Sequence, residues 1–426
     1  MPTSKSLRWW MISLLTIGTI LNYLTRGTLA TAAPTLMQEL HITESQYSWI
    51  IGFFQGGIML QPVVGYILDS IGLKIGLALF ASGWAVFTMA HGLGNSWQAF
   101  ATLRGLLGFA EGTTHTAGMK VVADWFPANE RGLASGIYNI GAAVGAAIAP
   151  PLVATAIYFY DWRAAFVIIG GLAFVWVALW WRFYDSPAKH RSLSQHERAY
   201  IEAGQEEHLT SGAGRPSVWH IVRQRNFWGI ALPRFLADPT WGTLSFWIPL
   251  YLTRVHGFDL RQIAIFAWLP FLAADLGSMF GPVLVLWLQR RGVGLINARK
   301  GAFTIGAFMM VSMMFVGQVH NPYAALALIC FGGFAHQTLS VTVITMSSDL
   351  FRRNEIGTVA GMAGTMANLG VLLFSLLMGA LVATVGYNPF FFALGVLDLI
   401  GAVVLWTLVR EPVNPAPVAP AVAAVR

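Results

Sequence analysis

Long stretches of this chain contain no acidic or basic side chain and no histidine. Three of them are residues 132–160, 301–319 and 356–397. Each can supply a run of about 20 apolar residues, which a helix needs to cross the hydrocarbon core of a bilayer. The runs lack the alternating pattern of barrel strands, and backbone polar groups must be paired inside lipid. We therefore expect helices that span a membrane.

The composition excludes an ordinary water-soluble fold of this length. Of the 426 residues, 56% are hydrophobic and only 11% are charged. Soluble domains carry about 25% charged residues. We therefore predict an all-α membrane protein. The few charged side chains that remain within the apolar stretches need a specific explanation, because lipid does not solvate them.

The apolar stretches fall into two groups of six, which predicts twelve transmembrane helices in two bundles. The first bundle occupies residues 1–183, with spans at 9–32, 48–68, 75–90, 97–120, 133–158 and 164–183. The second bundle occupies residues 227–410, with spans at 227–252, 262–287, 302–319, 323–345, 358–384 and 390–409. A polar linker at 184–226 joins the bundles. Residues 411–426 form a Pro- and Ala-rich tail, typical of a disordered end.

The two predicted bundles also repeat in sequence. Segment 124–132 aligns with segment 349–357, and the Asp, Phe, Asn, Glu and final Gly positions are identical. The same offset also matches two further glycines and an alanine within residues 133–145. Parallel repeats of this kind place a pseudo-twofold axis along the membrane normal. A solute site then lies between the halves near the middle of the bilayer.

The basic residues follow the loops of this topology. With the N-terminus in the cytoplasm, the inside segments hold 19 of the 26 Lys and Arg residues and the outside segments hold three. This is the positive-inside bias. It predicts that both termini are cytoplasmic, and it accounts for the net charge of +7 without a nucleic-acid partner. The alternative of a cleaved signal peptide at the start is disfavoured, because Asn22 and Arg26 interrupt the apolar run and more spans follow at once.

One short loop carries a recognisable motif. After the second span, Gly65, Asp69, Gly72 and Lys74 match the cytoplasmic-loop signature of the major facilitator superfamily, although Ser70 stands where a base is usual. The chain therefore resembles that superfamily, and the resemblance implies a transporter that works by alternating access. We expect Asp69 and Lys74 to clamp the two halves together on the cytoplasmic side.

Three further segments resemble the anion:cation symporters, particularly bacterial hexuronate transporters. They are residues 23–26, 104–111 and 333–349. The resemblance spans essentially the whole chain and implies a sugar-acid substrate. Many relatives carry an Asp immediately before the first-span arginine, where this chain has Thr25. The absence of that carboxyl argues against a second proton-binding group at this position.

Charged residues within spans are the first candidates for function. Arg26 is interpreted as the anchor for a substrate carboxylate, because a guanidinium binds a carboxylate through two parallel hydrogen bonds, and Tyr23 supplies a hydroxyl beside it. The alternative is that Arg26 extends to water at the membrane surface. Glu111 is interpreted as the proton-coupling carboxyl. Arg104, seven residues before Glu111 on the same helix face, is expected to be a second cation for the substrate carboxylate. Alternatively, Arg104 and Glu111 form a buried structural ion pair.

The remaining candidates are polar and aromatic. Arg234 and Asp238, at i and i+4, are expected to form a structural pair. Asp275 and Asp398 also lie within spans. His336 is expected to contact the substrate and could titrate, or it could be a hydrogen-bonded packing residue. Residues expected to bind the hydroxyls and ring of a sugar, or alternatively to bridge helices or sit at the membrane interface, are Gln55, Asn139, Gln337, Asn368, Trp241 and Trp247.

We therefore interpret the sequence as a proton-coupled symporter that imports a hexuronate, such as glucuronate or galacturonate, across the bacterial inner membrane. Other sugar acids (galactonate, gluconate, glucarate) and other organic anions are the alternatives. A membrane enzyme or a transporter-like sensor is a distant one, because no loop carries a catalytic cluster or a folded extension. We expect a functional monomer in the lipid bilayer, with no cofactor or metal, and a transported proton that sodium could replace.

Overall fold

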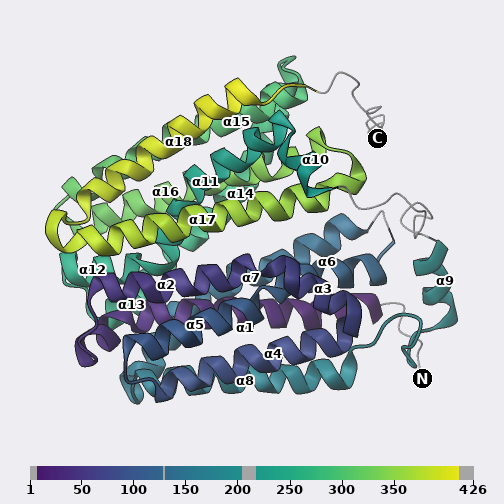
Figure 1. The fold of residues 1–426 in the computed structure, drawn as a ribbon, viewed down its shortest axis with the longest axis horizontal. Helices are drawn as coiled ribbons and strands as arrows, with labels where there is room; N and C mark the ends of the chain where they lie inside the picture. Colours follow the sequence, from purple (N-terminus) through teal and green to yellow (C-terminus); the bar gives the residue numbers. More distant parts are fainter. Residues whose placement is uncertain (1–6, 128–129, 204–216, 412–426) are drawn as a thin grey trace.

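The computed structural model describes residues 7–127, 130–203 and 217–411, and its helices group into the twelve expected spans (Figure 1). The first bundle contains α1 (Leu7–Glu39), α2 (Glu44–Met59) with α3 (Gln61–Ile71), α4 (Leu73–Ala90) with η1 (His91–Leu93), α5 (Trp97–Glu111) with α6 (Thr113–Trp125), α7 (Arg131–Phe159) and α8 (Trp162–Phe183). Helices α9 (Gln195–Ala203) and α10 (Val218–Val222) follow it. The second bundle contains α11 (Arg225–Phe246) with α12 (Ile248–His256), α13 (Leu260–Phe266) with α14 (Leu269–Arg290), α15 (Leu295–Met310) with η3 (Val311–Gln318), α16 (Pro322–Leu350), α17 (Arg353–Val385) and α18 (Asn388–Leu408).

Not all of these spans are equally apolar. Among the described residues, eight helical stretches are long and apolar enough to cross a membrane, or nine if α2 and α3, bent by 42°, count as one. The spans that fall short are α1, α5 with α6, and α11 with α12. Each of these three carries charged side chains well inside its sequence. Most of the charged residues expected within spans therefore lie on helices that depend on protein neighbours rather than on lipid; Asp275 of α14 and Asp398 of α18 are exceptions.

Helix packing repeats between the two bundles. Helix α1 packs on α7 and α8, as α11 packs on α17 and α18. Helix α2 packs on α5 as α14 packs on α16, and the pairing of α4 with α8 corresponds to that of α15 and η3 with α18. Each of these pairings in the first bundle recurs in the second bundle six spans later, which confirms the predicted pseudo-symmetric pair of six-helix bundles.

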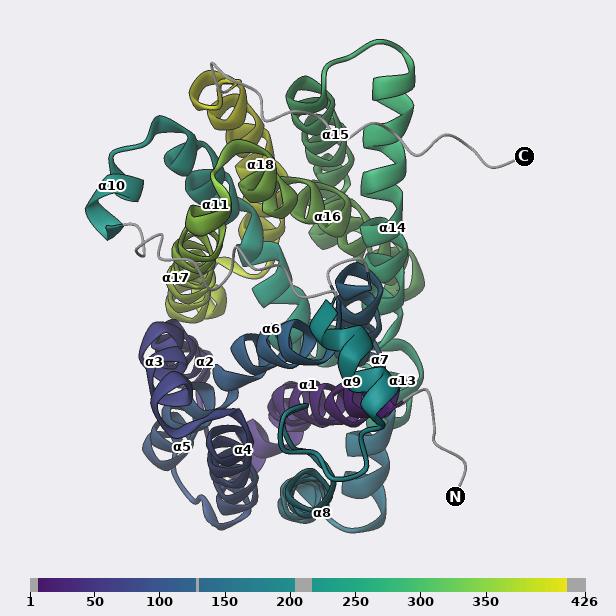
Figure 2. The same ribbon diagram turned by 90° about the vertical axis from the view of Figure 1, so that its right-hand side faces the viewer.

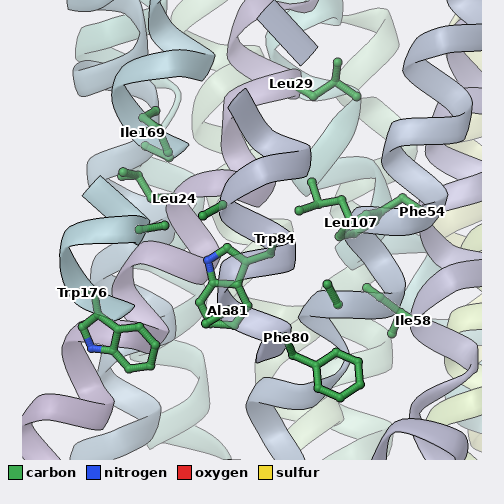
Figure 3. Packing of buried hydrophobic residues seen from close by; sticks show 14 of the residues in the cluster. Leu24, Leu29, Phe54, Ile58, Phe80, Ala81, Trp84, Leu107, Ile169 and Trp176 are labelled. Atoms are coloured by element: carbon green, nitrogen blue, oxygen red, sulfur yellow. The ribbon is translucent and has the colours of Figure 1, made fainter. Parts of the chain in front are cut away.

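The core of the first bundle holds α1 firmly against α4 and α8. Trp84 and Trp176 stack with ring centroids 5.9 Å apart (Figure 3). The indole nitrogen of Trp176 donates a hydrogen bond to the carbonyl of Leu14 over 2.8 Å. Gly18 is required beside this ring, because a Cβ there would lie 2.4 Å from it. This packing fixes the position of α1 along its own axis relative to α8, and therefore also the position of Arg26.

The bundles touch each other most directly at the end opposite the chain termini (Figure 1). There the Tyr47 hydroxyl of α2 donates to the Phe246 carbonyl of α11 over 2.7 Å. Glu44 and Arg254 form an ion pair at 3.6 Å at the same end. Viewed along the helices, α17 lies beside α2, and α14 lies beside α7 (Figure 2). These contacts hold one end of the molecule closed.

At the opposite end, the described ion pairs stay within one bundle and its adjoining linker. Arg8 bonds both Glu130, at 2.8 Å, and Glu197 of α9, at 3.0 Å. The bond from Arg8 lowers the pKa of Glu130 below its usual range. In the second bundle, Arg299 pairs with Asp349 at 2.7 Å. Among the described residues the two ends therefore differ: these polar contacts join the two bundles at the closed end, whereas the ion pairs of the opposite end do not.

Candidate functional site

A cavity of about 170 Å³ lies between the bundles, lined by residues from both. The first bundle contributes Tyr23 and Arg26 from α1 and Phe54 and Gln55 from α2, while the second contributes polar and aromatic residues of α11, α14 and α17. Its most polar lining residues are Tyr23, Arg26, Thr31, Gln55, Arg234, Asp238, Ser245 and Asn368. A mostly apolar pocket with a few convergent polar groups is the usual form of a small-molecule site.

Arg26 is tied to Glu111 in this structure. Its Nε lies 2.8 Å from Glu111 Oε2, and the Thr25 hydroxyl donates to Glu111 Oε1. The Glu111 side chain is fully buried, whereas the Arg26 side chain keeps 25% of its surface exposed. The Arg26 guanidinium also lies over the Tyr23 ring, 4.8 Å from its centroid. One face of Arg26 is thus held by the acid while the rest borders the cavity.

Arg104 does not pair with Glu111, so that alternative expectation from the sequence is wrong. Its side chain is buried, and none of its three nitrogens has a hydrogen-bond partner among the described residues. The guanidinium lies 5.4 Å from the centroid of the Phe54 ring. Seven residues separate the two along α5, about 10 Å of helix rise. Arg104 still interacts with Glu111 electrostatically, but the ion pair of Glu111 is made by Arg26 of the neighbouring α1.

The span that carries Glu111 is also not one continuous helix. Helix α5 ends at Glu111, and α6 begins at Thr113 after Gly112. The expected single span at 97–120 therefore becomes two helices that meet beside Arg26. The acid is the last residue of α5, directly at this junction.

Arg234 and Asp238 form the expected i,i+4 pair, at 3.4 Å. The sequence-based interpretation gave them only a structural role, but both line the cavity. Their side chains are 15% and 16% exposed. Pro233 and Pro239 flank the pair within α11. Prolines inside a span are tolerated where neighbouring groups or a cavity can satisfy the backbone groups that they leave unpaired. Pro233 and Pro239 were therefore the sequence signal that α11 borders a cavity.

Of the other predicted substrate-binding residues, the cavity brings together Tyr23, Gln55 and Asn368. The Asn368 side-chain nitrogen donates to the Gly364 carbonyl over 2.9 Å, which leaves its oxygen for another partner. Trp241 also lines the cavity. These residues come from both bundles, so a solute held here would contact both.

Besides Arg104, which is buried and does not line the cavity, four predicted substrate-binding residues lie elsewhere. Asn139 is exposed on α7, and Gln337 is partly exposed on α16; neither lines the cavity. His336 is buried behind Trp241, stacked on its ring at 6.3 Å. Trp247 is fully buried at the closed end, where its ring meets that of Tyr47 at 5.4 Å. Direct contact of these four with a solute in this cavity stays a prediction for other conformations.

The predicted gating loop is described in part. Lys74 pairs with Asp185, just after α8, at 3.1 Å. Both residues belong to the first bundle and the start of the linker, so in this conformation Lys74 does not bridge the two halves. Asp69 belongs to α3, and its side chain lies outside the described part of the structure. A clamp between the halves stays a prediction.

The comparisons with known proteins agree with this architecture. A sequence profile of the Major Facilitator Superfamily matches residues 15–298 and 293–424. The chain belongs to the Major Facilitator Superfamily. The crystal structure of a D-xylose-proton symporter superposes with a TM-score of 0.73 at 17% sequence identity, covering 94% of this chain and 97% of that one. At this identity the likeness concerns the fold alone.

Two curated relatives are much closer in sequence. The hexuronate transporter of Escherichia coli (strain K12) is 50% identical over 410 residues, which cover 96% of this chain and 95% of the relative. The galacturonate transporter of Dickeya chrysanthemi is 48% identical, over 76% of this chain and 94% of the relative. The resemblance inferred from the motifs is confirmed. This protein is a multi-pass membrane transporter rather than an enzyme.

The described residues also offer no obvious metal site. Within them, no group of three or more His, Cys, Asp or Glu side chains is arranged to hold a metal ion. The charged groups that border the cavity are instead two arginines, each held by one acid. The chemistry this site offers is recognition of an anion.

Proposed function

We propose that this protein is a proton-coupled symporter that imports a hexuronate across the bacterial inner membrane by alternating access. The termini and the linker lie in the cytoplasm, and one chain forms the working unit. The relatives named for hexuronate and galacturonate transport, which align over most of the chain, support this substrate class. The basic residues on the loops of the termini side support the orientation.

The observation that carries the proposal is the placement of two guanidinium groups at one cavity. Arg26 borders it from the first bundle and Arg234 from the second. A hexuronate has one carboxylate, which an arginine binds with charge-assisted hydrogen bonds. Gln55, Ser245 and Asn368 supply hydrogen-bonding groups for the hydroxyls, and the Trp241 ring supplies an apolar wall. The site thus matches a small, polar, singly charged ring.

Coupling follows from the contact between Arg26 and Glu111. The substrate carboxylate and Glu111 compete for the same guanidinium. When Glu111 takes up a proton it loses its charge, and Arg26 becomes free to bind the substrate. When the proton leaves, Glu111 reclaims Arg26 and the substrate is released. A proton and a substrate therefore favour the same loaded state, which is the thermodynamic condition for symport.

The conformation fits an inward-facing carrier. The bond between Tyr47 and Phe246 and the pair of Glu44 with Arg254 close the end remote from the termini. With cytoplasmic termini, that closed end faces the periplasm. Glu111 is bonded to Arg26 here, as expected for an empty carrier that has released its proton.

The test is uptake of radiolabelled glucuronate and galacturonate by cells that express the chain. We expect accumulation that a protonophore abolishes and that does not require sodium. Galactonate, gluconate and glucarate serve as competitors that separate hexuronates from other sugar acids. Stronger inhibition by any of these three than by glucuronate would contradict the hexuronate assignment and favour that sugar acid. Uptake that follows a sodium gradient would show that sodium, and not the proton, is the coupling ion.

A further inference from the structure

A groove of about 560 Å³ runs between α4 and α8, on the outer surface of the first bundle. The two helices lie side by side, on the side of this bundle that is remote from the second bundle (Figure 2). Both are long and apolar enough to cross a membrane. The groove shares no lining residue with the cavity between the bundles. It therefore opens towards lipid and is separate from the candidate substrate site.

The groove exists because small side chains of the two helices lie beside large ones. On α4, Ala78 is buried, whereas Ile75 is 53% exposed. On α8, Trp181 is 55% exposed and lies beside the small Ala178. From Ile75 to Ser82 the groove follows α4 for about 10 Å. One leaflet supplies about 15 Å of hydrocarbon, half of the bilayer core, so one acyl chain is long enough to fill the groove.

The end of the groove nearest the chain termini carries two cations. Lys74 lies one turn before Ala78 on α4, and Arg182 lies one turn after Ala178 on α8. Residues four apart share a helix face, so both cations continue the rows of residues that line the groove. The Lys74 ammonium lies 5.9 Å from the centroid of the Trp181 ring, which is part of the groove wall. In the proposed orientation, this end lies at the cytoplasmic surface of the bilayer.

Both cations are available to an anion from the bilayer. Lys74 pairs with Asp185 at 3.1 Å, but the two side chains are 31% and 34% exposed. Exposed ion pairs contribute little stability, so this pair is easily replaced. Arg182 is exposed, and it forms no ion pair with the residues that the structure describes. Two cations thus face one acid at this end of the groove, which favours a negatively charged ligand.

We propose that this groove binds an anionic phospholipid of the cytoplasmic leaflet. One acyl chain lies between α4 and α8, and the phosphate binds Lys74 and Arg182 through charge-assisted hydrogen bonds. Basic pockets between transmembrane helices on the cytoplasmic side are suited to anionic headgroups. Trp181 lies where tryptophan is favoured, at the boundary between hydrocarbon and water. The proposal uses the orientation proposed above and does not depend on the identity of the transported solute.

The experiment measures the binding of radiolabelled phosphatidylglycerol to the full-length protein in detergent micelles, with zwitterionic phosphatidylcholine as the comparison. We expect a saturable site that prefers phosphatidylglycerol. Replacing both cations, by Lys74→Gln with Arg182→Gln, should raise the Kd for phosphatidylglycerol at least about tenfold. An excess of inorganic phosphate should not displace the lipid, because free phosphate gains nothing from the apolar groove. Displacement by phosphate, or equal affinity for the two lipids, would overturn the proposal.

Further variants separate the groove from its cations. Ala178→Phe fills the groove and should also weaken the binding of phosphatidylglycerol, whereas Val175→Phe makes a similar change at an exposed residue of α8 outside the groove. Arg291→Gln removes a cation that lies over a different tryptophan, 4.2 Å from the centroid of the Trp287 ring. Both controls should bind the lipid as the wild type does. Equal weakening by the controls would show non-specific adsorption and would overturn the proposal.

A measurement on the wild-type protein covers the case in which the variants do not fold. Phosphatidylglycerol with a photoactivatable diazirine on one acyl chain is bound and irradiated, and the labelled peptides are identified by mass spectrometry. Labels within residues 75–82 and 174–181 support the site. Labels that fall only on other helices would overturn it.

Discussion

Arg26 of the first span and Glu111 of the fourth are joined by a 2.8 Å contact between Nε and Oε2, at the edge of the cavity between the bundles. The acid is fully buried and the arginine is partly exposed. A buried charge that loses its only partner is costly, about 3 to 5 kcal/mol. Any event that separates the pair must therefore provide a new anion for Arg26 and a proton or a cation for Glu111. A substrate carboxylate replaces Glu111 at Arg26, and a proton neutralises Glu111.

The first prediction removes the proton-binding group. Glu111→Gln keeps the size of the side chain but cannot bind and release a proton, and it leaves Arg26 permanently available. We expect glucuronate accumulation driven by a pH gradient of one unit to fall at least about tenfold, since each proton contributes that factor. Exchange of internal for external glucuronate, which needs no net proton movement, should persist. Accumulation equal to that of the wild type would remove Glu111 from the coupling mechanism.

The second prediction changes the geometry of the anchor and keeps its charge. Arg26→Lys replaces a planar fork by a point charge that cannot bind a carboxylate through two parallel bonds. Hydrogen bonds to charged groups are worth about 1.5 to 3 kcal/mol, so we expect the KM for glucuronate to rise about ten- to a hundredfold. Arg163→Lys, at the ion pair with Glu39 away from the cavity, is the matched control. An unchanged KM for Arg26→Lys would mean that the arginine does not touch the substrate.

The fold was predictable because lipid imposes a strict requirement on length and polarity. The twelve apolar stretches, the repeat of segment 124–132 at 349–357 and the motif near Lys74 each pointed to the same architecture. The pair of Arg234 with Asp238 was also predictable, since the helical period alone brings i and i+4 together. Features within one helix follow from the sequence pattern.

The partner of Glu111 was not predictable in this way. The contact with Arg26 depends on how closely α1 approaches the junction of α5 and α6. The spacing of residues along the sequence does not indicate where two separate helices meet. The break at Gly112 was not predicted either, although Glu111 and the polar residues 113–116 beside it interrupt the apolar pattern. The same reason explains Trp247, which resembles a residue that covers a sugar but packs at the closed end against Tyr47.

The third prediction concerns the closed end. Tyr47→Phe deletes the hydroxyl that bonds the Phe246 carbonyl across the bundles. Loss of one such bond costs about 0.5 to 1.5 kcal/mol, so the open population of this end should rise by up to about tenfold. Cys330 is the only cysteine, so Cys330→Ser gives a background in which Ser48→Cys, at the contact of α2 with α17, reports opening by its rate of thiol labelling.

The control for this variant lies within one bundle. The Tyr138 hydroxyl donates to the Thr114 carbonyl over 3.2 Å, and both residues belong to the first bundle. Tyr138→Phe removes a bond of the same type without touching the contact between bundles. Its labelling rate at position 48 should match that of the parent. An equal increase in both variants would show that Tyr47 acts on general stability and does not hold the closed end.

The last prediction concerns which solutes the cavity admits. Uronates should inhibit glucuronate uptake far better than the matching neutral hexoses, which keep the ring and lack the carboxylate. A neutral sugar cannot replace Glu111 at Arg26, so its binding leaves a guanidinium unpaired at a cost of about 3 to 5 kcal/mol. This corresponds to at least about a hundredfold weaker inhibition. The measurement compares glucuronate, galacturonate, glucose and galactose at one pH. If glucose inhibited as well as glucuronate, Arg26 and Arg234 would have a structural role and would not bind a substrate carboxylate.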